Sequence, residues 1–495
     1  MMYNNCKRGA TMKKQVFNPY LPNYEYVPDG EPHVFNDRLY IFGSHDRFGS
    51  RFFCDNDYVT WSAPLSDLSD WKFHGIIFRK DQDPLNKNDL FPLFAPDVVQ
   101  GKDGRYYLYY CPAGTKTVGV AVCDVPDGQY EFLAHVKDAE GNLLGLRNYD
   151  PYPFDPAVFI DDDGSIYLYI GFYPEEDYDW MEREFGTHPH SSGAFVLKLE
   201  DDMVTIKQDY RRIEITDCED KGHLFFEASS LRKINSLYYF IYSSIYSHEL
   251  CYATSVSPAG PFRYRGILHD NGNIGLDGIT EENRISYTGN NHGSLVELNG
   301  QWYIFGHRPT NYSVFARQGI AERVYISDDG FIPQAEMTSC GLNGGPLKPE
   351  GKYGAVMACC LKTAEGALHY LDNCEGPGFE GIRENHPAFS QDGEDREDSP
   401  NQYIKNMRDG SICGFKYFSY TDSSDITVIT RGDDGIFKIR TSPDGEILAE
   451  IPLKKKQEYH ESIPVKIVFP KTEKLALYFT YRGSGSIDFL SFEFC

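Results

Sequence analysis

Five polar side chains recur at matching positions in the first two-thirds of the chain. Each lies ten to twelve residues before a tyrosine in an aromatic-rich segment. Carboxylates and imidazoles exchange protons and bind ligands, so a set of them at equivalent positions predicts a chemical site. An acidic residue near a strand can also simply close a turn, but five coincident positions favour a site. The residues are Asp29, Asp97, Asp155, Glu227 and His292, followed by Tyr40, Tyr107, Tyr167, Tyr239 and Tyr303.

The segments that follow these residues share one pattern. Each has an apolar strand, a turn containing Asn, Asp or Gly, and an aromatic-rich strand. The tyrosines stand about 60 to 70 residues apart, which is enough for a four-stranded sheet with loops. Five such sheets predict a five-bladed β-propeller, in which the first strands line a central channel and the polar residues ring its mouth. Unrelated hairpins in a β-sandwich are the alternative. The segments are 34–42, 98–110, 158–169, 231–243 and 295–305.

Composition excludes several classes of partner. The chain has 495 residues, with 73 acidic and 48 basic side chains and a formal charge of -25. This charge repels nucleic acid and anionic membrane surfaces. No segment approaches the roughly 20 apolar residues of a membrane span, and the start, MMYNNCKRGATMKK, lacks the apolar stretch of a signal peptide. We therefore expect a cytoplasmic protein without membrane or nucleic-acid partners. The twelve cysteines show no zinc-like spacing.

Several longer motifs resemble glycoside hydrolase family 43, five-bladed propeller enzymes that act mostly on arabinose- and xylose-containing polysaccharides. The resemblance covers about two-thirds of the chain, in the order and spacing of the family. The motifs are PDGEPHVFNDRLYIFGSHD (28–46), FAPDVV (94–99), FDPAVFIDDDGSIYLYIG (154–171), FFEASSLRK (225–233) and NNHGSLVELNGQWYIFGHR (290–308).

The resemblance implies three catalytic carboxylates. Asp29 takes the place of the general base, Asp155 that of the carboxylate which orients the acid and tunes its pKa, and Glu227 that of the general acid. The first family motif often reads Ala-Asp-Pro, whereas this chain has PDGEP at 28–32. Alignment on the proline would make Glu31 the base, but counting back from the strand without gaps favours Asp29.

Other roles follow from the same resemblance or from closeness to the motifs. No cofactor is expected to be required, although a calcium ion or a water can occupy the central channel of such a propeller. The remaining candidates are His292 as the residue that holds this ion or water, Arg308 as a substrate-contacting arginine, Asp97 as a neighbour without a proton-transfer role, and Phe94, Tyr287 and His307 as sugar contacts.

The expected reaction is acetal hydrolysis with inversion, which the family resemblance implies. An inverting enzyme needs an acid for the leaving oxygen and a base that activates water, with the two carboxyl groups roughly 6.5 to 9.5 Å apart. Phe225, Phe226 and the charge of Asp155 should raise the pKa of Glu227, while Asp29 must stay ionised.

The last third of the chain has a different composition. Strand-like segments follow at short intervals after residue 426, and they resemble a β-sandwich of the family 6 carbohydrate-binding type. Such a domain can bind sugar, or it can stabilise the propeller and shape its pocket. We expect a flexible extension at residues 1–14, the propeller at 15–340 and the sandwich at 346–495.

Several functions fit these motifs. The first is an exo-acting α-L-arabinofuranosidase or β-xylosidase that removes terminal residues from short oligosaccharides. Another sugar specificity is possible within the same chemistry, such as a galactofuranosidase or an endo-arabinanase. A non-catalytic sugar-binding propeller and a glycoside phosphorylase are alternatives from other classes. The sequence predicts no oligomeric state.

Overall fold

The computed structural model describes residues 16–173, 192–369, 385–396 and 400–495, and the predicted extension at 1–14 lies outside them. The described chain is all-β, as predicted. Its helices are single 3₁₀ turns, none of which is long and apolar enough to cross a membrane. They are η1 (Lys80–Gln82), η3 (Lys221–His223), η4 (Gly341–Asn343) and η5 (Ala355–Met357).

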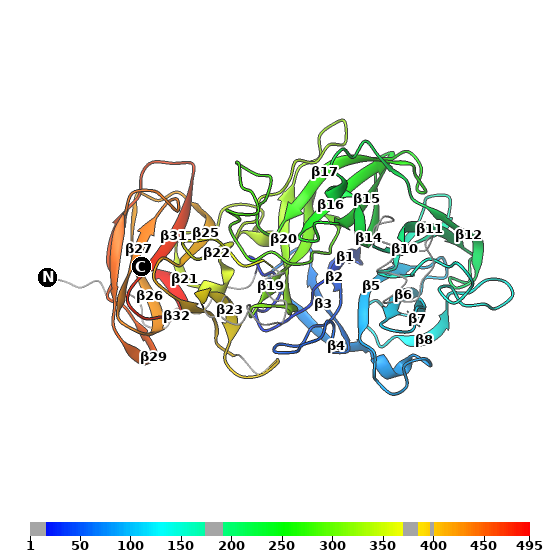
Figure 1. Ribbon diagram of the computed structural model, residues 1–495, viewed down its shortest axis with the longest axis horizontal. Coiled ribbons are helices and arrows are strands. Elements are labelled where there is room, and N and C mark those ends of the chain that lie inside the picture. Colours follow the sequence, from blue (N-terminus) through cyan, green and yellow to red (C-terminus); the bar gives the residue numbers. More distant parts are fainter. Residues whose placement is uncertain (1–15, 174–191, 370–384, 397–399) are drawn as a thin grey trace.

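Five sheets follow one another in the first two-thirds of the described chain, and Figure 1 shows them in blue to green. All neighbouring strands are antiparallel except β13, which is parallel to β17. The first sheet contains β1 (Glu31–Phe35), β2 (Arg38–Phe42), β3 (Tyr58–Pro64) and β4 (Lys72–Phe78), and the second β5 (Leu93–Gln100), β6 (Tyr106–Pro112), β7 (Gly119–Cys123) and β8 (Glu131–His135). The third contains β9 (Ala157–Ile160), β10 (Ile166–Phe172), β11 (Gly193–Leu199) and β12 (Ile206–Arg212). The fourth contains β13 (Ile215–Thr216), β14 (Phe225–Ile234), β15 (Leu237–Ser244), β16 (Glu249–Ser255) and β17 (Phe262–Asp270), and the fifth β18 (Leu295–Leu298), β19 (Gln301–Thr310) and β20 (Ser313–Val324).

The five predicted hairpins all form, and each tyrosine anchor lies on the second strand of its hairpin. These strands are rich in aromatic and β-branched residues, which suit a pleated surface packed on both faces. The strand β10, for example, is buried along its whole length. Turn residues with left-handed backbone, such as Asn36, Asp37, Asn235 and Asn299, connect the first and second strands.

The first strands of the five hairpins (β1, β5, β9, β14 and β18) are neighbours around a closed ring. Side chains from one first strand bond to the next, and strands β18 and β1 are also in contact. This arrangement brings residues that are far apart in sequence to the same axis. The bonds join His33 to Asp97 (β1 to β5), Asp97 to the Val158 N–H (β5 to β9), Asp155 to the Ala228 N–H (β9 to β14) and Arg232 to the Leu295 carbonyl (β14 to β18).

The N-terminal segment lies along the outer strand of the fifth sheet. The Asn18 side chain donates to the Ala321 carbonyl and accepts the Ala321 N–H, and the Tyr20 N–H bonds to the Gly319 carbonyl. Because β20 carries these contacts, the start of the described chain supports the sheet that ends the ring.

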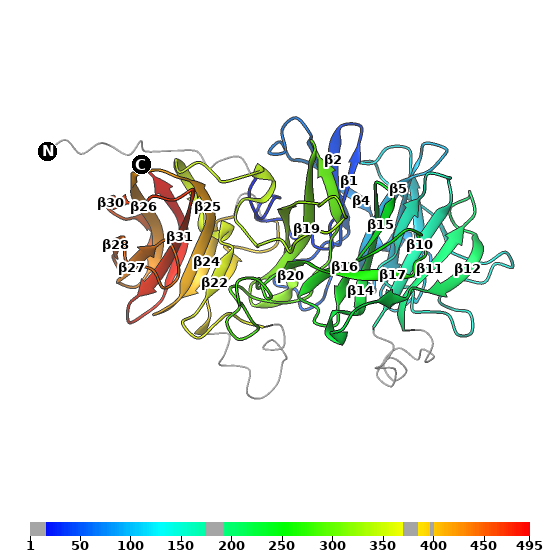
Figure 2. The same ribbon diagram turned by 90° about the horizontal axis from the view of Figure 1, so that it is seen from above.

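The C-terminal third forms two further sheets, shown in yellow to red in Figures 1 and 2. One contains β21 (Gly351–Gly354), β23 (Ala388–Gln391), β24 (Gln402–Met407), β26 (Ser423–Gly432), β29 (Lys456–Glu461), β30 (Val465–Val468) and β32 (Ile487–Phe494). The other contains β22 (Cys360–Lys362), β25 (Ile412–Ser419), β27 (Gly435–Arg440), β28 (Ala449–Leu453) and β31 (Lys474–Arg482).

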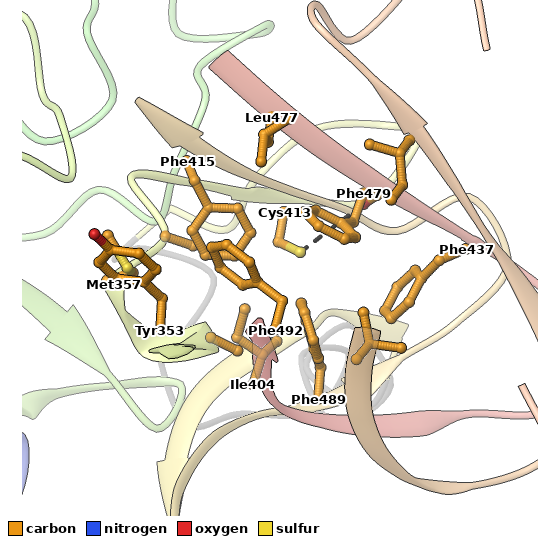
Figure 3. Packing of buried hydrophobic residues seen from close by; sticks show 14 of the residues in the cluster. Tyr353, Met357, Ile404, Cys413, Phe415, Phe437, Leu477, Phe479, Phe489 and Phe492 are labelled. Atoms are coloured by element: carbon orange, nitrogen blue, oxygen red, sulfur yellow. Dashed lines mark hydrogen bonds between the residues drawn. The ribbon is translucent and has the colours of Figure 1, made fainter. Parts of the chain in front are cut away.

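Aromatic side chains from both C-terminal sheets share one core (Figure 3). The rings of Phe415 and Phe479 contact each other, and each also contacts the rings of Phe489 and Phe492, with centroids 4.7 to 6.4 Å apart in tilted or edge-to-face geometry. Such pairs each add about 0.5–1.5 kcal/mol beyond the area that they bury. The C-terminal third therefore has a hydrophobic core of its own.

The two parts of the chain are joined by specific polar contacts. The Thr288 N–H donates to the Leu368 carbonyl, and the Leu361 N–H donates to the Ile285 carbonyl. Near the other end of the junction, Asp395 accepts bonds from the Phe48 N–H at 2.9 Å and from the Asn56 side chain at 3.0 Å. The C-terminal part thus holds the loop that follows β2.

Candidate active site

A cavity of about 360 Å³ opens where the five first strands meet. Residues from all five sheets and their loops line it. Its polar lining comprises Asp29, Asp155, Glu227, Ser247, Asn290, His292 and Arg317. Its aromatic lining comprises Phe53, Phe94, Tyr152, Phe154, Phe172 and Phe226. The three predicted catalytic carboxylates therefore share one pocket with apolar walls.

Left-handed backbone presents the carboxylates to the pocket. Asp29 has a φ of 56° and Asp155 a φ of 44°, and each lies two residues before the first strand of its sheet. Glu227 instead lies within β14, where the register shifts on both sides of it and Ala228 has a φ of 66°. Non-glycine residues in this region cost of order 1–3 kcal/mol and are concentrated at functional sites. The local strain re-aims three side chains toward one space.

Asp29 is held as an anion. Its Oδ1 lies 3.0 Å from Nη1 of Arg317, and the side chain is 7% exposed. Burial alone would raise the pKa of Asp29, but the Arg317 guanidinium, together with the charge of His292, lowers it below its usual value. An ionised carboxylate in a pocket can accept a proton from water.

His307 fixes the backbone of Asp29 as a neutral imidazole. Burial and the nearby Arg317 charge lower the pKa of His307 to about 3. Its Nδ1 accepts the Asp29 N–H at 3.2 Å, and its Nε2 is 2.8 Å from the Asn290 carbonyl. This network assigns the proton to Nε2, because Nδ1 must accept. His307 therefore positions Asp29 from behind the pocket.

Glu227 is kept protonated. Burial, followed by the charges of Asp155 and Asp29, raises the pKa of Glu227 to about 8. Burial also raises the pKa of Asp155 to about 7, against the opposing charge of His292. Two carboxylates that share an apolar site cannot both ionise cheaply. One pocket thus holds an ionised carboxylate and a protonated one.

His292 lies between two first strands. Its Nδ1 is 3.6 Å from Asp155 and its Nε2 is 3.8 Å from Glu31. Burial would lower the pKa of His292, but Glu31, Asp155 and Asp29 raise it to about 9. A protonated imidazole supplies positive charge between these carboxylates.

Glu31 lies deeper than Asp29 and does not line the pocket. Its Oε2 forms an ion pair of 2.6 Å with Arg232, which, together with His292, lowers the pKa of Glu31 to about 2 against the effect of burial. Its Oε1 is buried and has no hydrogen-bond partner in the described residues.

The channel below the pocket offers ligand atoms for a cation. The side chains of Glu31, His33 and Asp97 present one ligand atom each within 4.8 Å of one another. Calcium prefers oxygen ligands, whereas His33 offers a nitrogen that already pairs with Asp97, and the Asp97 oxygens also accept the Val98 and Val158 N–H groups. Of the three side chains, Glu31 alone keeps an oxygen without a hydrogen-bond partner in the described residues, so the set does not fit a calcium ion. The protonated His292 does not offer a lone pair either. That His292 holds an ion stays a prediction.

Arg308 lies away from the pocket. Its guanidinium donates to the carbonyls of Val356 and Ala358 and to the Gln318 side chain, and it stacks 3.8 Å above the Phe389 ring. The position does not support the predicted substrate contact, because the side chain is buried in the junction with the C-terminal part.

Of the other predicted binding residues, Phe94 lines the pocket, whereas Tyr287 and Asp97 lie elsewhere. Phe94 lines the pocket, next to Ala95, on β5. Tyr287 lines a separate small cavity beside the C-terminal part. Asp97 is buried in the ring, where it accepts the Val98 and Val158 N–H groups and pairs with His33 at 2.7 Å. Asp97 thus joins sheets and does not reach the pocket.

Arg317 was missed by the motifs. It lies on β20, the third strand of its sheet, where no predicted segment extends. The pairing of β19 with β20 sets Pro309 opposite Arg317 and Arg308 opposite Gln318. Neighbours along a strand point to opposite faces, so Arg317 shares the face of His307, two residues from Pro309. Because successive side chains of a strand point to opposite faces, the GHR motif could have indicated that His307 and Arg308 face opposite sides of the sheet.

A protonated carboxylic acid and an ionised carboxylate facing one pocket are the two groups that most glycoside hydrolases use for catalysis. The chain belongs to the glycosyl hydrolases family 43, whose profile matches residues 27–332. This confirms the resemblance seen in the motifs.

Relatives match over different shares of the chain. A xylosidase/arabinosidase from Thermoclostridium stercorarium is 45% identical over 494 residues, covering 98% of this chain and all of the relative. A family 43 β-xylosidase/α-arabinofuranosidase from a compost metagenome, solved with xylotriose, is 28% identical with a TM-score of 0.51, over 66% of this chain and 98% of that one. An arabinoxylan arabinofuranohydrolase from Bacillus subtilis, 20% identical with a TM-score of 0.51, shares the fold over 98% of both chains.

Proposed function

We propose that this protein releases terminal xylosyl or arabinofuranosyl residues from short oligosaccharides by inverting hydrolysis. The observation that carries the proposal is the opposed protonation of Asp29 and Glu227 in one pocket. The 45% identity to a xylosidase/arabinosidase over nearly the whole chain supports this pair of sugars. A cavity of about 360 Å³ suits one or two small sugar rings.

In this mechanism Glu227 gives its proton to the leaving oxygen while Asp29 takes a proton from the attacking water. The water oxygen bonds to the anomeric carbon on the face opposite the leaving group, so the configuration inverts. Asp29 then releases its proton to solvent and Glu227 recovers one. The position of Asp29 on the pocket wall, with Glu31 paired to Arg232, favours Asp29 as the base.

Asp155 adjusts the acid. Its charge adds to burial in raising the pKa of Glu227, and its Oδ2 accepts the Ala228 N–H beside the acid. Arg317 and Asn290 line the same space, where sugar hydroxyls would bind. The aromatic wall of Phe94, Phe154 and Phe172 excludes water and offers apolar faces to the sugar ring.

We also infer that the five sheets are the blades of a five-bladed β-propeller and that the C-terminal sheets form a β-sandwich of the carbohydrate-binding-module type. The closed ring of first strands supports the former, and the single core of two facing sheets supports the latter. The buried Arg308 contacts and the Asp395 bonds favour a stabilising role for the sandwich over a separate sugar site. A water in the channel beside His292 fits these contacts better than a calcium ion held by Glu31, His33 and Asp97, and it would have no part in proton transfer.

The activity can be tested with a panel of nitrophenyl glycosides and with xylobiose and arabino-oligosaccharides. We expect turnover of the xyloside or the arabinofuranoside, with the product first appearing in the inverted anomeric form by NMR. Inactivity on both sugars, together with turnover of a galactofuranoside or another glycoside, would contradict the substrate assignment. Cleavage that requires phosphate would contradict hydrolysis.

A further inference from the structure

Asp46 is a buried carboxylate that the proposed mechanism does not use. It follows β2 within the GSHD segment at 43–46, and it is fully buried. Its Oδ2 accepts the Arg317 backbone N–H at 3.0 Å and Nε at 2.8 Å, and its Oδ1 accepts Nη2 at 3.0 Å. Three bonds to one arginine are more than an incidental ion pair, because the two side-chain bonds form a bidentate fork.

The two bonds to Asp46 leave Nη1 of the Arg317 guanidinium to face Asp29 at the pocket. Nε and Nη2 of Arg317 are taken by Asp46, so Nη1 points to Asp29, 3.0 Å away. The guanidinium is planar and rigid, so fixing two of its nitrogens fixes the third. The orientation of Arg317 against Asp29 is therefore set by Asp46.

Asp46 also balances charge. Arg317 is a buried cation between two carboxylates, with 2% of its side chain exposed. Without Asp46, Asp29 alone would face the whole positive charge in apolar surroundings, where charges interact strongly. A base that is over-stabilised as an anion accepts a proton less readily.

The same carboxylate holds one wall of the pocket. Its Oδ1 accepts the Cys54 N–H at 3.0 Å, and the Phe53 ring lies 4.9 Å from the Arg317 guanidinium carbon. Both Phe53 and Cys54 line the cavity. Asp46 thus connects the loop after β2 to the arginine on β20.

We propose that Asp46 is a positioning residue of the hydrolysis: it aims Arg317 at Asp29 and offsets the charge that the base would otherwise face. This rests on the proposed role of Asp29 as the base. Among the described residues Asp46 does not itself line the pocket, so it acts through the residues that it holds, chiefly Arg317, which bonds to Asp29.

A double-mutant cycle on the full chain tests this path. Rates of an activated aryl glycoside are measured for wild type, Asp46→Asn, Asp29→Asn and the double variant. We expect Asp46→Asn to lower kcat by on the order of 10²-fold, the scale of a small misplacement at a reacting centre. In the Asp29→Asn background the same change should cost less than about 3-fold, because residues that act as a unit are non-additive.

Equal losses in the two backgrounds would overturn the proposal, since Asp46 would then act independently of the base. Full activity of Asp29→Asn would overturn both this proposal and the assignment of the base. If Asp29→Asn loses activity but Asp46→Asn lowers kcat by the same factor in both backgrounds, this proposal alone would be overturned. Asp46→Glu keeps the charge and should retain more activity than Asp46→Asn; equal impairment of the two would refute the charge-balancing role. If Asp46→Asn does not fold, Asp46→Glu can replace it in the double-mutant cycle.

A matched control is available in Asp83. It is equally buried and accepts bonds from Tyr110 and His135 away from the pocket. Asp83→Asn should lower the melting temperature while kcat stays within about 3-fold of wild type, which separates loss of a buried carboxylate from loss of positioning. A kcat loss for Asp83→Asn as large as that for Asp46→Asn would count against a specific role for Asp46.

Discussion

Asp155 accepts a hydrogen bond from the backbone N–H of Ala228, with 3.2 Å between Oδ2 and the nitrogen. Ala228 directly follows Glu227, so the bond ties Asp155 to the backbone that carries Glu227, the proposed acid. The charge of Asp155 also raises the pKa of Glu227 through space, after the larger effect of burial. Changes at Asp155 should therefore reach Glu227 by charge and by position together.

The first prediction concerns the pH profile of kcat/KM. The acid must be protonated, and the pKa of Glu227 is raised to about 8, so activity should fall as pH rises through this value. The base must be ionised, and the pKa of Asp29 is lowered from its usual value, so the acidic limb should lie below about pH 4. A profile measured with a non-ionising substrate should show a broad plateau between these limits. An alkaline limb below pH 6 would be inconsistent with a raised pKa of Glu227.

Asp155→Asn removes the charge nearest the acid. Burial is the first cause of the raised pKa of Glu227 and Asp155 the second, so the alkaline limb should move to lower pH without returning to that of a free glutamate. The exposed Asp163 is a matched control, because Asp163→Asn removes a carboxylate far from the pocket. An alkaline limb that stays in place in Asp155→Asn, with only the amplitude reduced, would show that Asp155 acts by position alone.

The raised pKa of Glu227 also has a consequence for stability. The folded protein keeps this proton between the ordinary pKa of 4.5 and about 8, where an unfolded chain releases it. The contribution to stability is complete below pH 4.5 and is lost as pH rises through 8. Glu227→Gln should therefore gain in melting temperature relative to wild type between pH 5 and pH 8.5, by a few degrees, since 1 kcal/mol shifts the melting point by roughly 2–4 °C. A constant difference across this range would argue against a buried, protonated Glu227.

Arg308 and Arg317 should behave differently when each is changed to lysine. Arg308→Lys loses the planar contacts with Phe389 and three acceptors at the junction, so its melting temperature should drop by several degrees while kcat/KM of the folded protein stays within about 3-fold. Arg317→Lys loses the fork between Asp29 and Asp46, and kcat/KM should fall on the order of 10²-fold. A raised KM in Arg308→Lys with an unchanged melting point would instead restore the predicted substrate contact.

The hairpins and the pocket carboxylates could be predicted because both are local. Strand alternation and the tyrosine anchors specify each first and second strand. Asp29 and Asp155 lie just before such a strand, and Glu227 lies within one. Arg317 could not be predicted in this way, because its place depends on the register between β19 and β20. Arg308 and Tyr287 lie near the motifs in sequence but face the C-terminal part, and this packing depends on contacts across more than 45 residues.

The central claim, that Glu227 is the general acid, is tested most directly by comparing two leaving groups in Glu227→Gln. An acid matters where the leaving oxygen needs a proton and matters little where it leaves readily. We therefore predict that kcat/KM falls by at least roughly 10²-fold for xylobiose or an arabinobiose, and far less for a dinitrophenyl glycoside of the same sugar. Equal losses for the two substrates would contradict the assignment of Glu227 as the acid.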